Sequence, residues 1–163
     1  MSKELIPLPE VLTLLAEAPS RLATLTAGVT PAQLRAAPAH DERSAIEVLA
    51  HLRSCADVWG GCIATILAEA RPTIRAMNPR TWVKKTGYRE LEFQPSLRAY
   101  TSQRKKLMVV LKSLPHEGWS RLATVTGAGA PPERTVLSYA QRMARHERRH
   151  IEQIQNIVNT IGK

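Results

Sequence analysis

Two histidines near the end of the chain have the spacing that two ligands of one metal ion need. They are His146 and His150, in the string HERRH. In a helix, residues four apart lie about 40° apart on one face, so both imidazoles can reach one ion. On a helical wheel the pair borders the apolar stripe of its segment. The alternative is two partly buried histidines that are satisfied by polar neighbours.

A third histidine, His51, lies in the strongest amphipathic segment of the chain and shares one stripe with Glu47 and Cys55. Polar side chains in such a stripe need a partner when they are buried. Helix bundles build metal centres from ligands on facing helices, so His51 would complete a three-histidine site with open positions. Cys55 is either a fourth ligand or a small apolar residue. Glu47 either accepts a hydrogen bond from His51 or completes a capping box.

Four long helices are expected to position these residues. Apolar spacing and capping signals place them at 9–27, 44–70, 95–114 and 136–161. The second opens with a capping box from Ser44 to Glu47, and the fourth has Thr135 as its N-cap. Pro19 is expected to kink or interrupt the first helix, and a short helical turn is expected after Thr30.

Two long connections separate these helices. Residues 72–94 lack helical periodicity and are expected to form a surface connection that covers one end of the bundle. Residues 116–134 contain several glycines and prolines, with an extended segment expected at 122–125. Four long helices with two crossover connections predict an all-α four-helix bundle that is not a simple up-and-down stack.

The composition fits one such domain over residues 1–163. Apolar residues make up 44% of the chain and aromatic residues only 4%, which indicates a core of packed aliphatic helices. Cys55 and Cys62 lie two turns apart in one helix and cannot bridge each other, which indicates free thiols in a reducing compartment. No apolar run reaches the roughly 18 residues of a membrane span, and no secretory signal is seen, so a cytoplasmic protein is expected.

The chain is basic, with 23 Lys and Arg against 14 Asp and Glu and a formal net charge of +9. This charge would attract anionic ligands or nucleic acid. The basic residues are scattered, however, without interleaved aromatic residues, so a solvated surface is preferred over nucleic-acid binding. Arg142, one turn before His146, lies either on that surface or where it can receive an acidic group of a ligand.

The string HERRH also matches the HExxH motif of zincin metalloproteases, in which the glutamate activates water. The chain resembles zincins only in part. Arg148 and Arg149 stand where zincins usually have uncharged residues, and Glu152 is the sole acid that follows as a third ligand. Glu147 falls on the core side of the wheel, away from His146. A peptidase is therefore the weaker interpretation.

The better resemblance is to the DinB superfamily (DinB/YfiT-like) of metal-binding four-helix bundles, and it covers almost the whole chain. The family pattern has a helix with a capped S-x-x-E and an L-x-H-L core, and a last helix with H-x-x-x-H. Residues 44–52 read SAIEVLAHL, and residues 139–154 read YAQRMARHERRHIEQI. One departure is Arg43, where many members have tryptophan.

This resemblance implies a zinc, nickel, iron or manganese ion on His51, His146 and His150. Similar bundles include thiol-dependent transferases and isomerases, metal-dependent hydrolases and proteins of unknown activity, so the family alone does not give the reaction. A transferase that uses a low-molecular-weight thiol is preferred over a hydrolase, because such thiols carry carboxylates that Arg142 could receive.

The alternative is a non-catalytic metal-binding protein associated with stress or DNA damage, as the family's name suggests. For the enzyme, a small-molecule substrate is expected. Because dimers are common among such bundles, a homodimer in the bacterial cytoplasm is expected as well.

Overall fold

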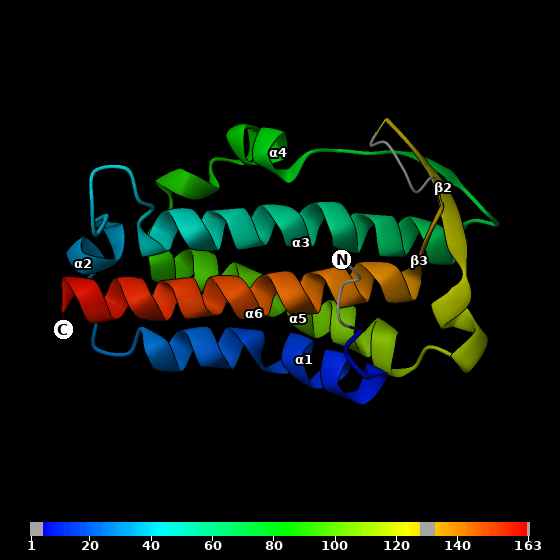
Figure 1. Cartoon of the computed structure of the whole chain (residues 1–163), viewed down its shortest axis with the longest axis horizontal. Coiled ribbons are helices and arrows are strands. Elements are labelled where there is room, and N and C mark those ends of the chain that lie inside the picture. The colour runs from blue at the N-terminus through cyan, green and yellow to red at the C-terminus, as the bar shows by residue number, and fades with distance from the viewer. Residues whose placement is uncertain (1–4, 128–132, 163) are drawn as a thin grey trace.

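Four long helices run side by side in the computed structural model, which describes residues 5–127 and 133–162 (Figure 1). They are α1 (Leu8–Leu25), α3 (Ala45–Ala68), α5 (Phe93–Lys112) and α6 (Val136–Ile161). Between them lie the short helices α2 (Pro31–Arg35) and α4 (Pro79–Thr86) and the 3-10 helices η1 (Tyr88–Glu90) and η2 (His116–Ser120). The predicted four-helix bundle with long crossover connections is confirmed.

Capping boxes begin the two helices that carry the histidines. At α3, the Ser44 hydroxyl oxygen accepts from the Glu47 amide, and the Glu47 carboxylate accepts from the Ser44 amide. At α6, Thr135 and Ser138 exchange the same pair of bonds. The predicted helix starts are confirmed. Glu47 serves the cap, and no hydrogen bond joins it to His51 among the described residues.

Pro19 does not interrupt α1, which continues through it. Proline has no N–H, so the carbonyl oxygen of Leu15 lacks its usual helical donor. The Nη1 atom of Arg104, in α5, donates to that oxygen at 2.9 Å. A carbonyl that would otherwise be buried without a partner therefore joins α1 to α5.

Arg104 also pairs with Glu147 of α6 in the centre of the bundle. Its Nη1 donates to Oε1 of Glu147 at 2.7 Å and its Nη2 donates to Oε2. The two residues are only 3% and 4% exposed. Burial, the largest single effect, disfavours the charged guanidinium, but the attraction of Glu147 and the contacts with Glu147 and Tyr100 together outweigh it and raise the pKa of Arg104. One guanidinium thus links three helices.

The connection between α3 and α5 is more ordered than the sequence predicts. It holds α4, which lies along α3 and does not cover an end of the bundle (Figure 1). The Asn78 side chain caps α4 by accepting from the Arg80 amide, Pro79 takes the first helical position, and Gly87 ends the helix with a φ of 73°. The prediction of an irregular segment was wrong because eight residues are too few to show clear periodicity.

Asp57 of α3 fastens this connection to the bundle. Its Oδ2 accepts from the Trp82 indole at 2.9 Å and from the Tyr88 hydroxyl at 2.6 Å. Its Oδ1 accepts from Gln103 of α5 at 2.7 Å. The guanidinium of Arg53 lies 3.7 Å from the centre of the Tyr88 ring. Together these contacts hold α4 and η1 against α3.

Replacing Asp57 with alanine is expected to loosen α4 while the four long helices stay folded. Three donors would lose their acceptor, and a hydrogen bond to a charged group contributes about 1.5–3 kcal/mol. Amide hydrogen exchange over residues 79–90 should therefore become faster, with little change in α6. Glu10→Ala, which removes an exposed carboxylate of α1, is the control. Unchanged exchange in α4 would contradict this role of Asp57.

A three-stranded sheet lies beyond one end of the bundle, where the two long connections meet. Strand β1 (Thr73–Arg75) pairs in parallel with β2 (Leu122–Thr126), and β2 pairs antiparallel with β3 (Glu133–Thr135). The predicted extended segment at 122–125 is confirmed, whereas β1, β3 and η2 were not expected. The expectation for residues 128–132 lies outside the described residues. None of the helices in the described ranges combines the length and apolar character needed to cross a membrane.

Candidate metal centre

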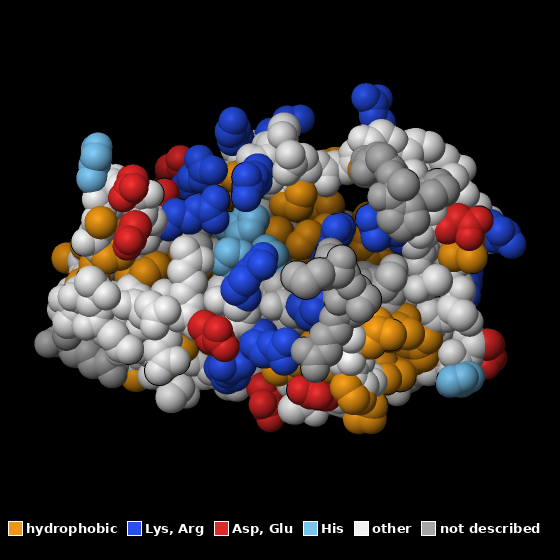
Figure 2. Space-filling view, viewed as in Figure 1, with side chains coloured by type: hydrophobic (Ala, Val, Ile, Leu, Met, Phe, Trp, Pro, Cys, Tyr) orange, Lys and Arg blue, Asp and Glu red, His pale blue; other side chains and the backbone are white. Residues whose placement is uncertain are grey.

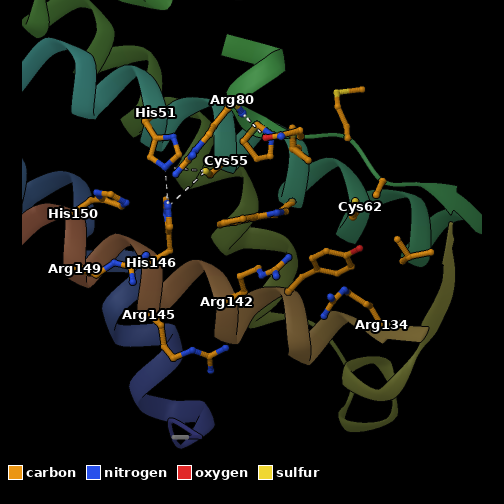
Figure 3. A pocket seen from close by; sticks show the side chains of 18 of the residues that line it. His51, Cys55, Cys62, Arg80, Arg134, Arg142, Arg145, His146, Arg149 and His150 are labelled. Carbon is orange, nitrogen blue, oxygen red and sulfur yellow. Dashed lines mark hydrogen bonds between the residues drawn. The ribbon is translucent and has the colours of Figure 1, made fainter. Parts of the chain in front are cut away.

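Three histidine rings meet between α3 and α6 (Figure 3). The ring centre of His51 lies 4.9 Å from that of His146 and 4.9 Å from that of His150. The two rings on α6 lie 4.3 Å apart. The structure therefore brings the rings of the three predicted ligands side by side. Among the described residues, the group whose donor atoms all lie within 4.8 Å of one another is His51, Cys55 and His146, so Cys55 takes a place in this group that His150 does not.

The nitrogen atoms of His51 and His146 have a spacing that suits one divalent ion. The Nε2 atoms of His51 and His146 are 3.0 Å apart. Two nitrogens that each lie about 2.1 Å from one ion are separated by about 3.0–3.4 Å. The Nδ1 atom of His146 is buried and has no hydrogen-bond partner among the described residues. The other ring nitrogen, Nε2, is the one that lies near Nε2 of His51 and Sγ of Cys55.

His150 is oriented by Gln153, one turn further along α6. Its Nδ1 lies 2.7 Å from Oε1 of Gln153. Because an amide oxygen only accepts hydrogen bonds, Nδ1 carries the proton and Nε2 keeps its lone pair. Such a partner on the outer nitrogen is the usual support of a histidine ligand.

The electrostatic surroundings keep all three imidazoles neutral. Burial, and then the charge of His150, lowers the pKa of His51 to about 4 and that of His146 to about 3. Burial also lowers the pKa of His150. Neutral imidazole is the form that binds metal, so no proton competes with the ion near neutral pH.

The histidines lie in a cavity of about 830 Å³. Figure 2 shows histidine side chains with basic side chains around them and hydrophobic side chains beside them. One side of the wall is apolar and includes Trp59, whose ring centre is 5.0 Å from that of His146. Arg142 also lines the cavity, and its guanidinium lies 5.3 Å from the centre of the Trp59 ring. Neither Asp nor Glu is found among the described residues that line the cavity.

The family model of the DinB superfamily matches residues 14–154. The chain belongs to the DinB superfamily. Among solved structures, this DinB-superfamily chain is similar to YfiT from Bacillus subtilis, a probable metal-dependent hydrolase with an unusual four-helix bundle topology. The TM-score is 0.79 at 18% identity, over 96% of this chain and 90% of that chain. At this identity the similarity shows the fold. A search of curated proteins finds no match.

The thiol of Cys55 lies beside two histidines of the candidate site in this DinB-superfamily chain. Its Sγ is 3.8 Å from the Nε2 atoms of both His51 and His146. Nitrogen and sulfur ligands of one tetrahedral ion are separated by about 3.6 Å. Burial, and then Glu147, raises the pKa of the thiol to about 12, so a metal would have to displace its proton. Cys55 and Cys62 are free thiols, as predicted.

Glu147 does not serve this site, although it lies between the two histidines in HERRH. Its carboxylate faces the bundle interior and is held by Arg104. A general base must lie within hydrogen-bond reach of the water that it activates. The zincin interpretation therefore lacks its base in this DinB-superfamily fold.

Several residues of the candidate site were missed in the sequence. Gln153 follows His150 at i+3, a spacing that places two residues on one helix face, and this signal was available. Arg43, Arg80, Arg134 and Arg149 line the cavity but come from four separate positions in the chain. Only the packing of α4 and the sheet against the bundle brings them together.

Proposed function

We propose that this DinB-superfamily protein is a metal-dependent enzyme that acts on a small molecule, with the metal held by His51, His146 and His150. The observation that carries the proposal is the convergence of three neutral imidazoles in an open cavity. A divalent zinc, nickel, iron or manganese ion bound there would lower the pKa of a thiol or water molecule that coordinates it.

Transfer to a low-molecular-weight thiol is the reaction that the cavity favours. The described lining residues include no carboxylate that could take a proton from the nucleophile. A thiol, with an ordinary pKa of about 8.5, ionises far more readily than water, at about 15.7. In such a transfer the thiol loses its proton to solvent. Its sulfur bonds to an electrophilic carbon, and the leaving group departs with the electrons of the broken bond.

The residues around the histidines would position the two reactants. The Arg142 guanidinium would bind an acidic group of the thiol. Trp59 and the apolar wall beside it would take the uncharged part of the electrophile and exclude water from it. Hydrolysis, with water as the nucleophile, is the second candidate, and the similarity to YfiT favours it.

The test is a paired assay of the metal-loaded protein. We expect metal-dependent conjugation of a thiol such as cysteine or glutathione to monochlorobimane, above the uncatalysed rate and absent in His146→Ala. Ester hydrolysis that needs metal but no thiol would support the hydrolase instead. Full metal loading without either activity would favour the non-catalytic metal-binding protein.

Gln153→Leu is expected to weaken metal binding about 10- to 100-fold, which is the usual loss when the partner of a histidine ligand is removed. The leucine preserves the size of the side chain but cannot accept from Nδ1 of His150. Calorimetric titration with zinc measures the change. Gln155→Leu, an exposed position on the same helix, is the control. Equal affinity for Gln153→Leu and wild type would contradict the orienting role.

Cys55→Ser is expected to retain one metal ion per chain, because three histidine nitrogens remain. Elemental analysis measures the content, and the absorption spectrum of the cobalt-substituted protein reports on the sulfur. A thiolate-to-cobalt band in wild type that is missing from Cys55→Ser would assign Cys55 as an additional ligand. Complete loss of metal from this variant would contradict a three-histidine centre.

A further inference from the structure

The cavity that holds the histidines is strongly basic. Six arginines line it, and we call them the arginine collar: Arg43, Arg80, Arg134, Arg142, Arg145 and Arg149. They come from the segment before α3, from α4, from β3 and from α6. The described lining residues contain no acidic side chain to balance them, and a bound divalent ion would add further positive charge.

Most of the collar takes no part in the ion pairs of the described chain. Those pairs are Arg35–Glu92, Arg71–Glu133 and Arg104–Glu147. Arg43, Arg80, Arg142 and Arg149 are in none of them. Concentrated like charges repel one another and are retained at a cost to stability, unless a ligand of opposite charge binds between them.

The collar arginines lie on different sides of the histidines (Figure 3). Arg134 and Arg142 lie towards the start of α6, Arg80 lies near His51 and Cys55, and Arg149 lies near His146 and His150.

We propose that the cavity binds a small molecule that carries at least two anionic oxygen groups, carboxylates or phosphates, which are held by collar arginines on different sides of the histidines. Arginine presents a planar set of donors that suits both kinds of anion. The inference rests on the proposed function, because it names the substrate class of the same site.

The shape of the site favours a small molecule over nucleic acid. A volume of about 830 Å³ is in the range of small-molecule sites. The basic side chains of the collar line this cavity, which also has an apolar wall formed in part by Val58, Trp59 and Val125. A ligand with acidic groups at its ends and an uncharged middle matches this arrangement.

Calorimetric titration of the full-length, metal-free protein tests the inference without interference from chelation of the metal. The probes are pyrophosphate and succinate, with acetate as the single-charge control and succinamide as the neutral one, all at constant ionic strength. We expect at least one of the two dianions to bind at least tenfold more tightly than acetate. Tighter pyrophosphate indicates a phosphate ligand, and tighter succinate a carboxylate ligand.

Two neighbouring arginines of α6 provide a matched pair of variants. Arg149 lines the cavity and Arg148 does not, although both changes to glutamine remove one positive charge. We expect Arg149→Gln and Arg142→Gln each to weaken dianion binding about tenfold and Arg148→Gln to change it less than twofold. Equal losses for Arg148→Gln and Arg149→Gln would show attraction by net charge alone and overturn the inference.

The remaining outcomes separate this inference from the proposed function. A protein that binds zinc at the histidines, but binds both dianions no better than succinamide with or without zinc, would overturn the inference alone. A protein that binds dianions but no metal would overturn the proposed function alone. Duplex DNA binding that depends on Arg149, with no binding of either dianion, would also overturn the inference.

Discussion

Glu147→Gln is expected to lower the free energy of unfolding by about 3–5 kcal/mol, the usual result of removing one partner of a buried ion pair. Arg104 would keep its charge in the centre of the bundle, where it is 3% exposed. Its remaining bond to the Leu15 carbonyl does not balance that charge. Chemical denaturation followed by circular dichroism measures the loss.

An exposed pair of the same charges is the control. Arg35 and Glu92 are also paired, but their side chains are 55% and 47% exposed. Glu92→Gln should therefore cost less than about 1 kcal/mol. A loss for Glu147→Gln as small as that for Glu92→Gln would contradict a structural role for the buried pair.

Glu147→Gln also separates the two interpretations of HERRH. The Glu147 carboxylate is buried in the bundle, where it holds helices together through Arg104. The variant should therefore bind zinc with nearly the wild-type affinity at temperatures where it is folded. Retained metal with normal kcat would fit this role, whereas retained metal with complete loss of activity would support a base of the zincin type.

His146→Ala is expected to weaken zinc binding more than 100-fold, a larger loss than removal of a ligand's supporting partner causes. The Nε2 atom of His146 lies 3.0 Å from Nε2 of His51 and 3.8 Å from Sγ of Cys55. At a metal concentration of 100 times Kd, wild type should gain about 2.7 kcal/mol of stability. The variant should gain almost none, and thermal unfolding with and without zinc measures the difference.

His116→Ala is the matched control for this experiment. His116 is an exposed histidine at the start of η2, outside the cavity. It should leave the zinc affinity and the stabilisation by zinc unchanged. Stabilisation of His146→Ala by zinc to the same extent as wild type would contradict the assignment of His146 as a ligand.

Much of the fold follows from local signals in the sequence. Ser44 and Thr135 cap the two helices that carry the histidines, and the histidine spacing within α6 places two rings on one face. These features depend on residues that are near one another in the chain, so pattern and chemistry together predict them. The encounter of His51 with His146 is non-local, and it was predicted from amphipathic faces and from the family resemblance.

The features that were not predicted depend on contacts between distant segments. The order of α4 comes from Asp57, which holds Trp82 and Tyr88. The core-side position of Glu147 was predicted, but its partner Arg104 was not, because Arg104 resembles any surface arginine in the sequence. The arginine collar is likewise visible only once four separate segments are packed together. Each of these features brings polar or charged side chains of distant segments together, which hydrophobic periodicity does not reveal.

Anomalous diffraction from crystals of the zinc-loaded protein, collected at the zinc edge, tests the three-histidine metal centre most directly. We predict one strong peak per chain between α3 and α6, within bonding distance of Nε2 of His51, His146 and His150. A fully loaded protein whose zinc lies elsewhere, or whose histidines contact no metal, would contradict this assignment.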